Sequence, residues 1–301
     1  MLCMNSLLLL VIQNKQLHPL MKIQTICVCG AGTMGSGIAQ AAAQSGIYTI
    51  LFDLNEAVIQ KAQTAIEKNL ASLVEKQKMT AEQKQQVLGN LLFTTDLHQC
   101  LADVIIEAII EKPEAKIALF NQLAEINHSE VIFASNTSSL SVSQLQQQIV
   151  QPQRVAGLHF FNPATIMKLV EVVKGRQTHE RVIQQLVSLV QQMNKVPVVC
   201  KDAPGFIVNR VARPYYTEAL RLVEEGVADY ATIDVLMEAS GFKMGPFKLM
   251  DLIGNDINYA VSCSVYDQLG QPERLKPSFL QKEKVESGKL GRKTGEGYYK
   301  Y

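Results

Sequence analysis

IQTICVCGAGTMGSGIAQAAAQSGIYTILFD, residues 23–53, is the stretch of sequence that decides the fold. An apolar, β-branched strand leads into a glycine turn, an alanine-rich helix follows, and a second apolar strand ends on an acid. Gly30 allows the tight turn, Gly32 lets a phosphate approach the backbone, and Gly35 lets the helix pack closely on the strand. The start of the helix offers free N–H groups and about half a positive charge. The order of these parts predicts a unit that binds the pyrophosphate of a dinucleotide.

The acid at the end of the second strand indicates which dinucleotide the protein binds. Asp53 follows the turn by about 20 residues, where a carboxylate accepts hydrogen bonds from a ribose hydroxyl. A 2′-phosphate about 4 Å away would be repelled by roughly 1 to 4 kcal/mol, and residues 54–56 contain no basic side chain to offset this. We therefore predict NAD rather than NADP. The predicted contacts in the turn are Gly30, Ala31, Gly32, Thr33, Met34 and Gly35. An ordinary tight turn is the alternative interpretation.

Composition narrows the class of protein. The 301 residues, 47% of them hydrophobic, suffice for two globular domains. The net charge of +1 argues against a nucleic acid or a membrane surface as the main partner. The six cysteines form no C-x-x-C pair. Cys27 and Cys29 share one face of the first strand, and we interpret them as core residues of a reduced, cytoplasmic protein without a disulfide or a metal site.

The first 20 residues do not fit this pattern. Residues 7–12 are apolar but too few to span a membrane, and the segment lacks the basic region and cleavage site of a signal peptide. Met21 lies just before the first strand. We expect residues 1–20 to be a disordered extension, or Met21 to be the natural start.

Helices and short apolar strands alternate after Asp53. Apolar periodicity predicts a helix over 55–78, and a capping box at Thr80 and Gln83 starts a second helix that ends near 89; this pair is long enough to project from the sheet. The expected strands are 91–94, 104–109, 131–134, 155–160, 168–173 and 196–200. The alternation predicts a parallel, doubly wound sheet. The link between the strands 155–160 and 168–173 is too short for a crossover helix.

Nearly everything beyond residue 202 has helical character. Glycines that follow apolar periodic segments, and Asp229 as a helix start, predict the bounds. The expected helices are 204–225, 230–240, 246–269 and 277–287. The sequence therefore predicts an α/β protein, with a Rossmann-type doubly wound sheet domain over 21–202 and an all-α C-terminal domain over 203–301.

Two ionisable residues inside apolar strands give the clearest indication of chemistry. His159 alone would be more typical of a core histidine, but Glu171 lies 12 residues later in an equally apolar strand. Burying an unpaired carboxylate costs several kcal/mol, so Glu171 needs a partner or a raised pKa. We expect the two side chains to face each other across the strand pair, with Glu171 orienting His159 as a general base.

Polar residues lie at two further points. Asn136–Ser139 follows a strand at the sheet edge where open α/β sheets bind ligands. Its hydroxyls could hold a substrate oxygen or cap the helix that begins near Ser141. Asn209 is expected one to two turns into an apolar helix, where asparagine is modestly unfavourable, so it is either functional or a packed polar residue.

Together these motifs resemble the 3-hydroxyacyl-CoA dehydrogenase family. The strings that carry the resemblance are GAGTMG (30–35), NTSS (136–139), HFFNP (159–163), KLVE (168–171), PGFIVNR (204–210) and GRKTGEGY (291–298). The resemblance runs from about residue 22 to Tyr301, and the chain is similar in length to family members that carry a single enzymatic activity. It excludes residues 1–20.

The resemblance implies reversible oxidation of a short-chain (3S)-3-hydroxyacyl-CoA, such as 3-hydroxybutyryl-CoA, to the 3-ketoacyl-CoA, with hydride passing to NAD. His159 would be the general base and Glu171 its partner. Ser138 and Asn209 would hold the reacting oxygens of the substrate. Further contacts implied by the resemblance are Glu111, Lys116, Ser138, Asn162 and Lys293 for NAD, and Asn69 and Lys76 for coenzyme A. A solvated helix face is the alternative for Lys76. The resemblance also implies a homodimer joined through the helical domain.

Two other functions stay open from the sequence. One is a 3-hydroxy-acid dehydrogenase whose substrate carries no coenzyme A. The other is a non-catalytic dinucleotide-binding relative, like the crystallin of this superfamily. His159 and Glu171 count against the first, and the intact set of four expected catalytic positions counts against the second.

Overall fold

A computed structural model describes residues 23–301 and places eight strands in one sheet. The sheet order is β3-β2-β1-β4-β5-β6-β7-β8, and every pair is parallel except β6 with β7. The strands are β1 (Thr25–Cys29), β2 (Tyr48–Phe52), β3 (Leu91–Thr94), β4 (Val104–Glu107), β5 (Ile132–Ser135), β6 (Val155–Phe160), β7 (Leu169–Lys174) and β8 (Val196–Lys201). The predicted doubly wound sheet is confirmed, and β6 and β7, whose link is too short for a crossover helix, pair antiparallel. The prediction for residues 1–20 lies outside the described residues.

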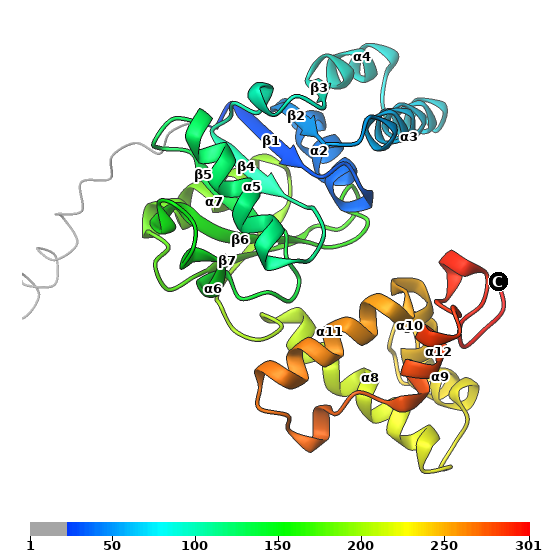
Figure 1. Cartoon of the computed structure of the whole chain (residues 1–301). Helices are drawn as coiled ribbons and strands as arrows, with labels where there is room; N and C mark the ends of the chain where they lie inside the picture. Colours follow the sequence, from blue (N-terminus) through cyan, green and yellow to red (C-terminus); the bar gives the residue numbers. More distant parts are fainter. Residues whose placement is uncertain (1–22) are drawn as a thin grey trace, which may run out of the picture.

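Helices cover both faces of the sheet, as a doubly wound fold requires (Figure 1). One apolar core joins the strands to α2 (Thr33–Gln44), α3 (Glu56–Glu75) and α7 (Glu180–Gln192). A second core joins them to α5 (Pro113–Ile126) and α6 (Val142–Gln146). The helix pair α3 and α4 (Ala81–Gly89) stands out from the sheet edge, and Thr80 and Gln83 form the predicted capping box.

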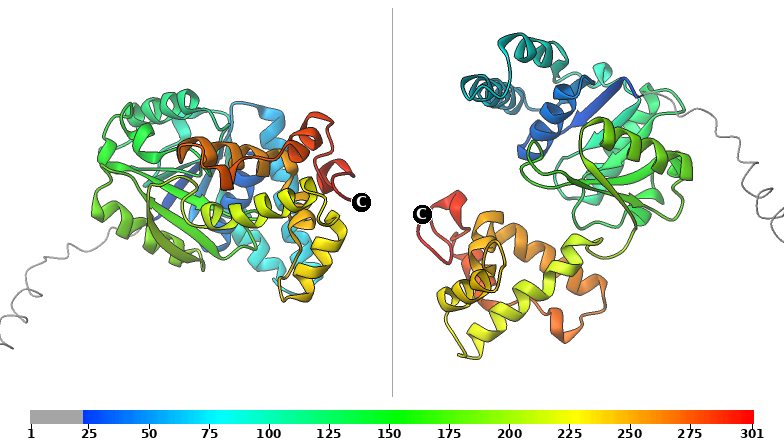
Figure 2. Two further views of the ribbon diagram at one scale, coloured as in Figure 1. Left: turned by 90° about the horizontal axis from the view of Figure 1, so that it is seen from below. Right: turned by 180° about the vertical axis from the view of Figure 1, so that it is seen from behind.

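The rest of the chain is helical and packs as a separate cluster below the sheet in Figure 1, also seen from behind in Figure 2. Its own apolar core gathers around Phe247, Met250 and Leu220. The helices are α8 (Val208–Glu224), α9 (Tyr230–Ala239), α10 (Pro246–Ile253), α11 (Asn255–Gln268) and α12 (Phe279–Glu286).

Two predicted helices are wrong in their bounds. The helix expected over 204–225 begins only at Val208, because Gly205 and Phe206 have φ of +70° and +49° and cannot lie in a right-handed helix. Asn209 is therefore in the first turn of α8. The helix expected over 246–269 is two helices, since Gly254 has φ of +102° and breaks it into α10 and α11.

Candidate functional site

The glycine turn between β1 and α2 has the geometry that the sequence predicts. Gly30 has φ of +100°, and a Cβ at Gly35 would lie 1.7 Å from the carbonyl oxygen of Gly30, so only glycine fits there. A Cβ at Gly32 would meet no atom within 4 Å, which leaves the backbone open to an approaching group. No side chain caps the start of α2, and its first turn holds no acid. The N–H groups there are free to bind a phosphate.

A cavity of about 680 Å³ opens beside this turn. Gly30, Gly32 and Asp53 line it, together with apolar side chains that include Leu54, two residues after β2, and Leu119 on α5. Asp53 accepts hydrogen bonds from the backbone N–H groups of Ala31 (2.9 Å) and Asn55 (3.0 Å). The carboxylate is thereby fixed beside the turn with lone pairs left over for a ribose. Size, apolar lining and free helix start fit the adenosine and pyrophosphate of a dinucleotide.

His159 and Glu171 are direct neighbours across the antiparallel strands β6 and β7. His159 Nδ1 lies 2.7 Å from Glu171 Oε2, and the two residues are 6% and 0% exposed. A carboxylate only accepts hydrogen bonds, so Nδ1 carries the proton and Nε2 of the neutral ring has a free lone pair. The rings of Phe161 and Phe206 pack around the imidazole, with centroids 4.5 and 5.8 Å away. This is the geometry of a general base held in one tautomer.

The second oxygen of Glu171 binds the start of α8. Oε1 accepts hydrogen bonds from the backbone N–H groups of Ile207 and Val208, both at 2.9 Å. Burial raises the pKa of Glu171, but the hydrogen bond from His159 and those from these N–H groups outweigh it and bring the pKa below its usual value. One carboxylate thus connects the base to the helical part of the chain.

Ser138 and Asn209 also meet at this junction. Asn209 Nδ2 donates to the carbonyl oxygen of Ser138 at 3.3 Å. The Ser139 carbonyl accepts from Gln268 Nε2 on α11 at 2.7 Å. Ser141, not the preceding residues, caps α6 with its side chain. The structure therefore brings the four expected catalytic residues to one boundary, where β5, β6, β7 and α8 end or begin.

A charge network that is buried at Glu107 and Lys116 and reaches the surface at Glu111 holds the turn that carries Ser138. Glu111 accepts hydrogen bonds from the Thr137 hydroxyl, the Ser138 N–H (3.1 Å) and the Ser139 hydroxyl (3.1 Å). Lys116 Nζ lies 3.0 Å from Glu111 and 2.6 Å from Glu107. Burial raises the pKa of Glu107 despite Lys116, whereas for Glu111 the lysine and Thr137 outweigh burial and lower it. Lys116 is 1% exposed, so the structure places this predicted cofactor contact inside the protein, between two acids.

Glu107 was not among the predicted site residues. Its side chain is 0% exposed and accepts hydrogen bonds from Ser135 Oγ (2.6 Å) and the Ile109 N–H (2.7 Å). The signal was present in the sequence, because Glu107 ends an otherwise apolar strand in the same way that Glu171 interrupts one.

The remaining predicted contacts lie apart from these groups. Asn162 precedes a cis proline in the link between β6 and β7. Lys293 forms an ion pair with Asp256 at 2.6 Å in the helical part. On α3, Asn69 donates to Gln40 on α2 at 3.3 Å, and Lys76 is an exposed residue at the C-terminal end. Among the described residues, no contact ties these four to His159.

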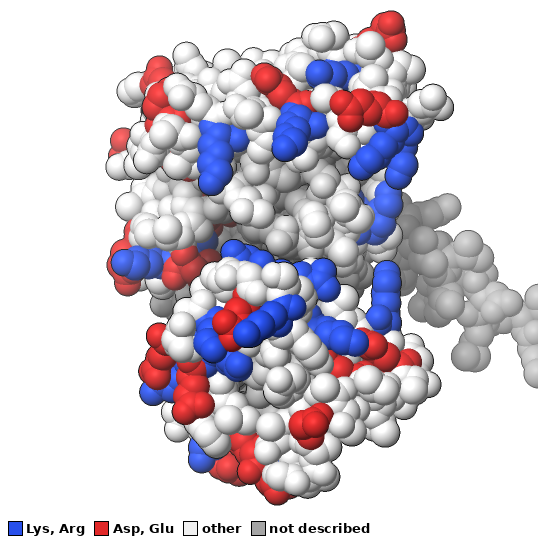
Figure 3. All heavy atoms as spheres, turned by 90° about the vertical axis from the view of Figure 1, so that its right-hand side faces the viewer, with Lys and Arg blue, Asp and Glu red and all other residues white. Residues whose placement is uncertain are grey.

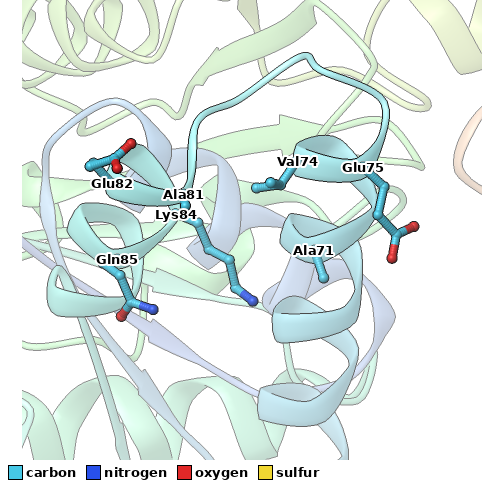
Figure 4. Close-up of a pocket in the computed structure, with 7 residues that line it drawn as sticks. All are labelled: Ala71, Val74, Glu75, Ala81, Glu82, Lys84 and Gln85. Atoms are coloured by element: carbon cyan, nitrogen blue, oxygen red, sulfur yellow. The ribbon is translucent and has the colours of Figure 1, made fainter.

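Surface features outside the cavity are less specific. A hollow of about 440 Å³ lies between α3 and α4, where Lys84 extends toward α3 past Ala71 and Val74 (Figure 4). None of its lining residues is buried, so the hollow offers no buried polar group to a ligand.

Figure 3 shows Lys and Arg side chains on both borders of a second hollow, between the sheet part and the helical part. That distribution suits a ligand with several negative charges.

Two family models match nearly all of the described chain. The sequence model described as "3-hydroxyacyl-CoA dehydrogenase, NAD binding domain" matches residues 25–203, and the one for the C-terminal domain matches 205–301. The chain belongs to the 3-hydroxyacyl-CoA dehydrogenase family. NAD is the cofactor that this family's first domain binds, and the cavity beside Gly30 and Asp53 fits it.

Known members of the 3-hydroxyacyl-CoA dehydrogenase family align with more than nine-tenths of this chain. It is 48% identical to the 3-hydroxyadipyl-CoA dehydrogenase of Escherichia coli over 93% of the chain, but it spans only 59% of that relative's length. Identity is 41% to a probable 3-hydroxybutyryl-CoA dehydrogenase of Deinococcus radiodurans, with 91% of this chain and 99% of that one covered. The crystal structure of (S)-3-hydroxybutyryl-CoA dehydrogenase from Ralstonia eutropha superposes with a TM-score of 0.88 at 36% identity, covering 93% and 99% of the two chains.

Residues 23–301 contain neither a metal-binding cluster nor a membrane-spanning helix. Within residues 23–301 no cluster of His, Cys, Asp and Glu side chains could hold a metal ion. No helix in the same range is long and apolar enough to cross a bilayer. The Cys27 and Cys29 thiols lie on one face of β1, as expected, with their sulfur atoms 3.7 Å apart.

Proposed function

We propose that this protein catalyses the reversible NAD-dependent oxidation of a short-chain (3S)-3-hydroxyacyl-CoA to the 3-ketoacyl-CoA, with His159 as the general base. The observation that carries the proposal is the buried pair of His159 and Glu171, 2.7 Å apart, next to Ser138 and Asn209. Family membership supports the reaction type, since relatives that share 41–48% of the sequence are named as dehydrogenases of 3-hydroxyacyl-CoA compounds.

The roles follow from the atoms. Nε2 of His159 accepts the proton of the 3-hydroxyl as the O–H bond breaks and the carbonyl forms. Glu171 stabilises the imidazolium that results, because its carboxylate already bonds Nδ1. Ser138 and Asn209 hold the reacting oxygen. Bound NAD supplies the hydride acceptor for the C3 hydrogen. In the reverse direction His159 returns the proton to the ketone oxygen.

We also propose the roles for the cofactor and coenzyme A contacts named above. The turn Gly30–Gly35 and Asp53 bind NAD, and Glu111 and Lys116 act on it by fixing the Ser138 turn. Asn162 and Lys293 are proposed NAD contacts. Asn69 and Lys76, with the basic side chains around the hollow of Figure 3, are proposed contacts of the coenzyme A moiety.

The organisation of the chain is a further part of the proposal. We place the boundary between an NAD-binding domain (21–202) and a helical domain (203–301) after β8, which ends at Lys201. A homodimer through the helical domain and a cytoplasmic location complete the proposal. Apolar side chains on that domain support the dimer, because Val211 (74%), Val235 (63%), Leu236 (62%) and Phe242 (50%) are exposed. Light scattering on the purified protein tests the dimer.

The function is tested by adding acetoacetyl-CoA and NADH to the purified chain and following NADH absorbance. We expect rapid oxidation of NADH, and no reaction of free 3-hydroxybutyrate with NAD. His159→Gln should lose activity by about 10²- to 10⁴-fold while NADH binding, measured by fluorescence, persists. His98→Gln, which changes an exposed histidine in a short helical turn, is the matched control. Near-normal turnover by His159→Gln would remove His159 from the mechanism, and activity on the free acid alone would favour a dehydrogenase that does not use coenzyme A.

A further inference from the structure

Arg213 is a buried cation without an anionic partner in the part of the chain that the structure describes. The residue is 3% exposed. Its Nε donates to the carbonyl oxygen of Asn209 at 2.9 Å, and its Nη1 donates to the Asn258 carbonyl at 3.0 Å and to Ser262 Oγ at 2.8 Å. All three acceptors are neutral. Burial lowers the pKa of the guanidinium to about 10, so it stays charged at neutral pH.

An anion would stabilise this arrangement. Buried charges in proteins are paired or bind a ligand, because removing an ion from water is costly. The neutral acceptors need hydrogen-bond donors but no positive charge. The face of Tyr216 covers one side of the guanidinium, with Cζ 4.8 Å from the ring centroid. The Nη2 amino group has no hydrogen-bond partner among residues 23–301, so two donors in the plane of the fork are left for a ligand.

The position of Arg213 on α8 limits which ligand group could meet it. Arg213 lies one helical turn beyond Asn209 on α8, and its side chain bends back to the Asn209 carbonyl. If Asn209 and Ser138 hold the oxygen on C3, an acyl chain that runs from C3 along α8 brings its far end to Arg213. Three further carbon–carbon bonds span about 4 Å, and a helical turn rises about 5.4 Å. The phosphates of coenzyme A lie beyond C1 and the pantetheine arm, on the other side of the reacting carbon.

We propose that Arg213 is a specificity residue that binds a carboxylate at the far end of the acyl chain. The substrate class is then a 3-hydroxyacyl-CoA whose acyl chain, about six carbons long, ends in a carboxylate rather than a methyl group. This inference rests on the proposed function, since it places the substrate by the roles of Asn209 and Ser138. The planar guanidinium matches a carboxylate geometrically, and the ion pair replaces the water that the carboxylate loses.

The test compares two six-carbon 3-ketoacyl-CoA substrates with NADH, one with a carboxylate at C6 and 3-ketohexanoyl-CoA with a methyl group. We expect the wild type to show a kcat/KM at least about tenfold higher for the carboxylate, as a hydrogen bond to a charged group implies. Arg213→Met should abolish this ratio mainly through the carboxylate substrate and leave 3-ketohexanoyl-CoA turnover within a few-fold. Arg213→Lys should retain part of the ratio. Arg221→Met, on the same helix and also bonded to a carbonyl, should keep all of it.

The possible outcomes distinguish the proposed role of Arg213 from the proposed dehydrogenase function. Equal or higher kcat/KM for 3-ketohexanoyl-CoA in the wild type overturns the role of Arg213 and leaves the dehydrogenase function intact. A carboxylate preference that survives in both Arg213 variants also overturns it. Failure to reduce either six-carbon substrate overturns the inference alone if acetoacetyl-CoA is still reduced, and overturns the proposed function as well if acetoacetyl-CoA is not. If Arg213→Met does not fold, the wild-type ratio and Arg213→Lys still decide the question.

Discussion

Replacing Glu171 by glutamine should remove most of the activity without changing the shape of the site. Both Ile207 and Val208 present N–H donors to Oε1, at 2.9 Å each, so the amide oxygen of the glutamine must take that side. The amide NH₂ then faces His159 Nδ1, where Oε2 of the carboxylate is 2.7 Å away in the wild type. An NH₂ group donates, so the ring proton moves to Nε2 and the base loses the lone pair that the reaction needs.

The magnitude follows from the charge that is lost. Two unit charges about 4 Å apart attract by about 4 kcal/mol at an effective dielectric constant of 20, which corresponds to about 10³ in rate. We therefore expect Glu171→Gln to lower kcat for acetoacetyl-CoA reduction by about 10³-fold, with NADH affinity unchanged. Steady-state NADH absorbance and fluorescence titration measure the two quantities, and Glu67→Gln on the exposed face of α3 is the matched control. A loss of less than tenfold in a folded Glu171→Gln protein would refute both the tautomer argument and the electrostatic one.

Three further predictions concern the charges of Lys116, Asp53 and Glu171. Lys116→Met leaves the buried Glu107 without its cation and should lower the free energy of unfolding by about 3 to 5 kcal/mol in urea titrations at neutral pH; an unchanged midpoint would contradict the network described above. Asp53→Asn keeps the acceptor for the Ala31 N–H but removes the charge, and should improve the kcat/KM of NADPH relative to NADH by about 5- to 1,000-fold, which paired cofactor assays measure. Because the folded pKa of Glu171 is lowered, its stabilising contribution is full above the unfolded pKa and is lost as pH falls through the folded pKa. The unfolding temperature should therefore fall less steeply at acidic pH in Glu171→Gln than in the wild type. The same fall in both proteins would contradict a stabilising role for the ionised Glu171.

The sequence predicted those parts of the site that depend on local backbone chemistry. Gly30 and Gly35 lie where only glycine fits. The β-branched strand before them and the acid after them favour a dinucleotide-binding turn over an ordinary tight turn. The facing of His159 and Glu171 was also predictable, because a short link forces antiparallel pairing and an apolar strand cannot hold a lone carboxylate.

What the sequence could not supply depends on contacts between distant segments. Arg213 looks like a surface residue of an amphipathic helix until α11 is placed over it. Lys116 looks like a ligand contact until Glu107 and Glu111 are seen on either side of it. Positive φ at Phe206, which delays α8, is rare for a bulky residue, and nothing in its local sequence apart from Pro204 and Gly205 signals it.

The bond between Glu171 and the start of α8 has a consequence for protein engineering. Oε1 contacts only main-chain N–H groups at positions 207 and 208, so the contact does not depend on which side chains occupy these positions. A helical half taken from another protein could therefore be joined after β8 with any residues except proline at these positions, provided that the preceding turn keeps the backbone of Gly205 and Phe206. Changing that turn would misdirect the donors and leave the carboxylate half satisfied, even though every catalytic side chain was retained.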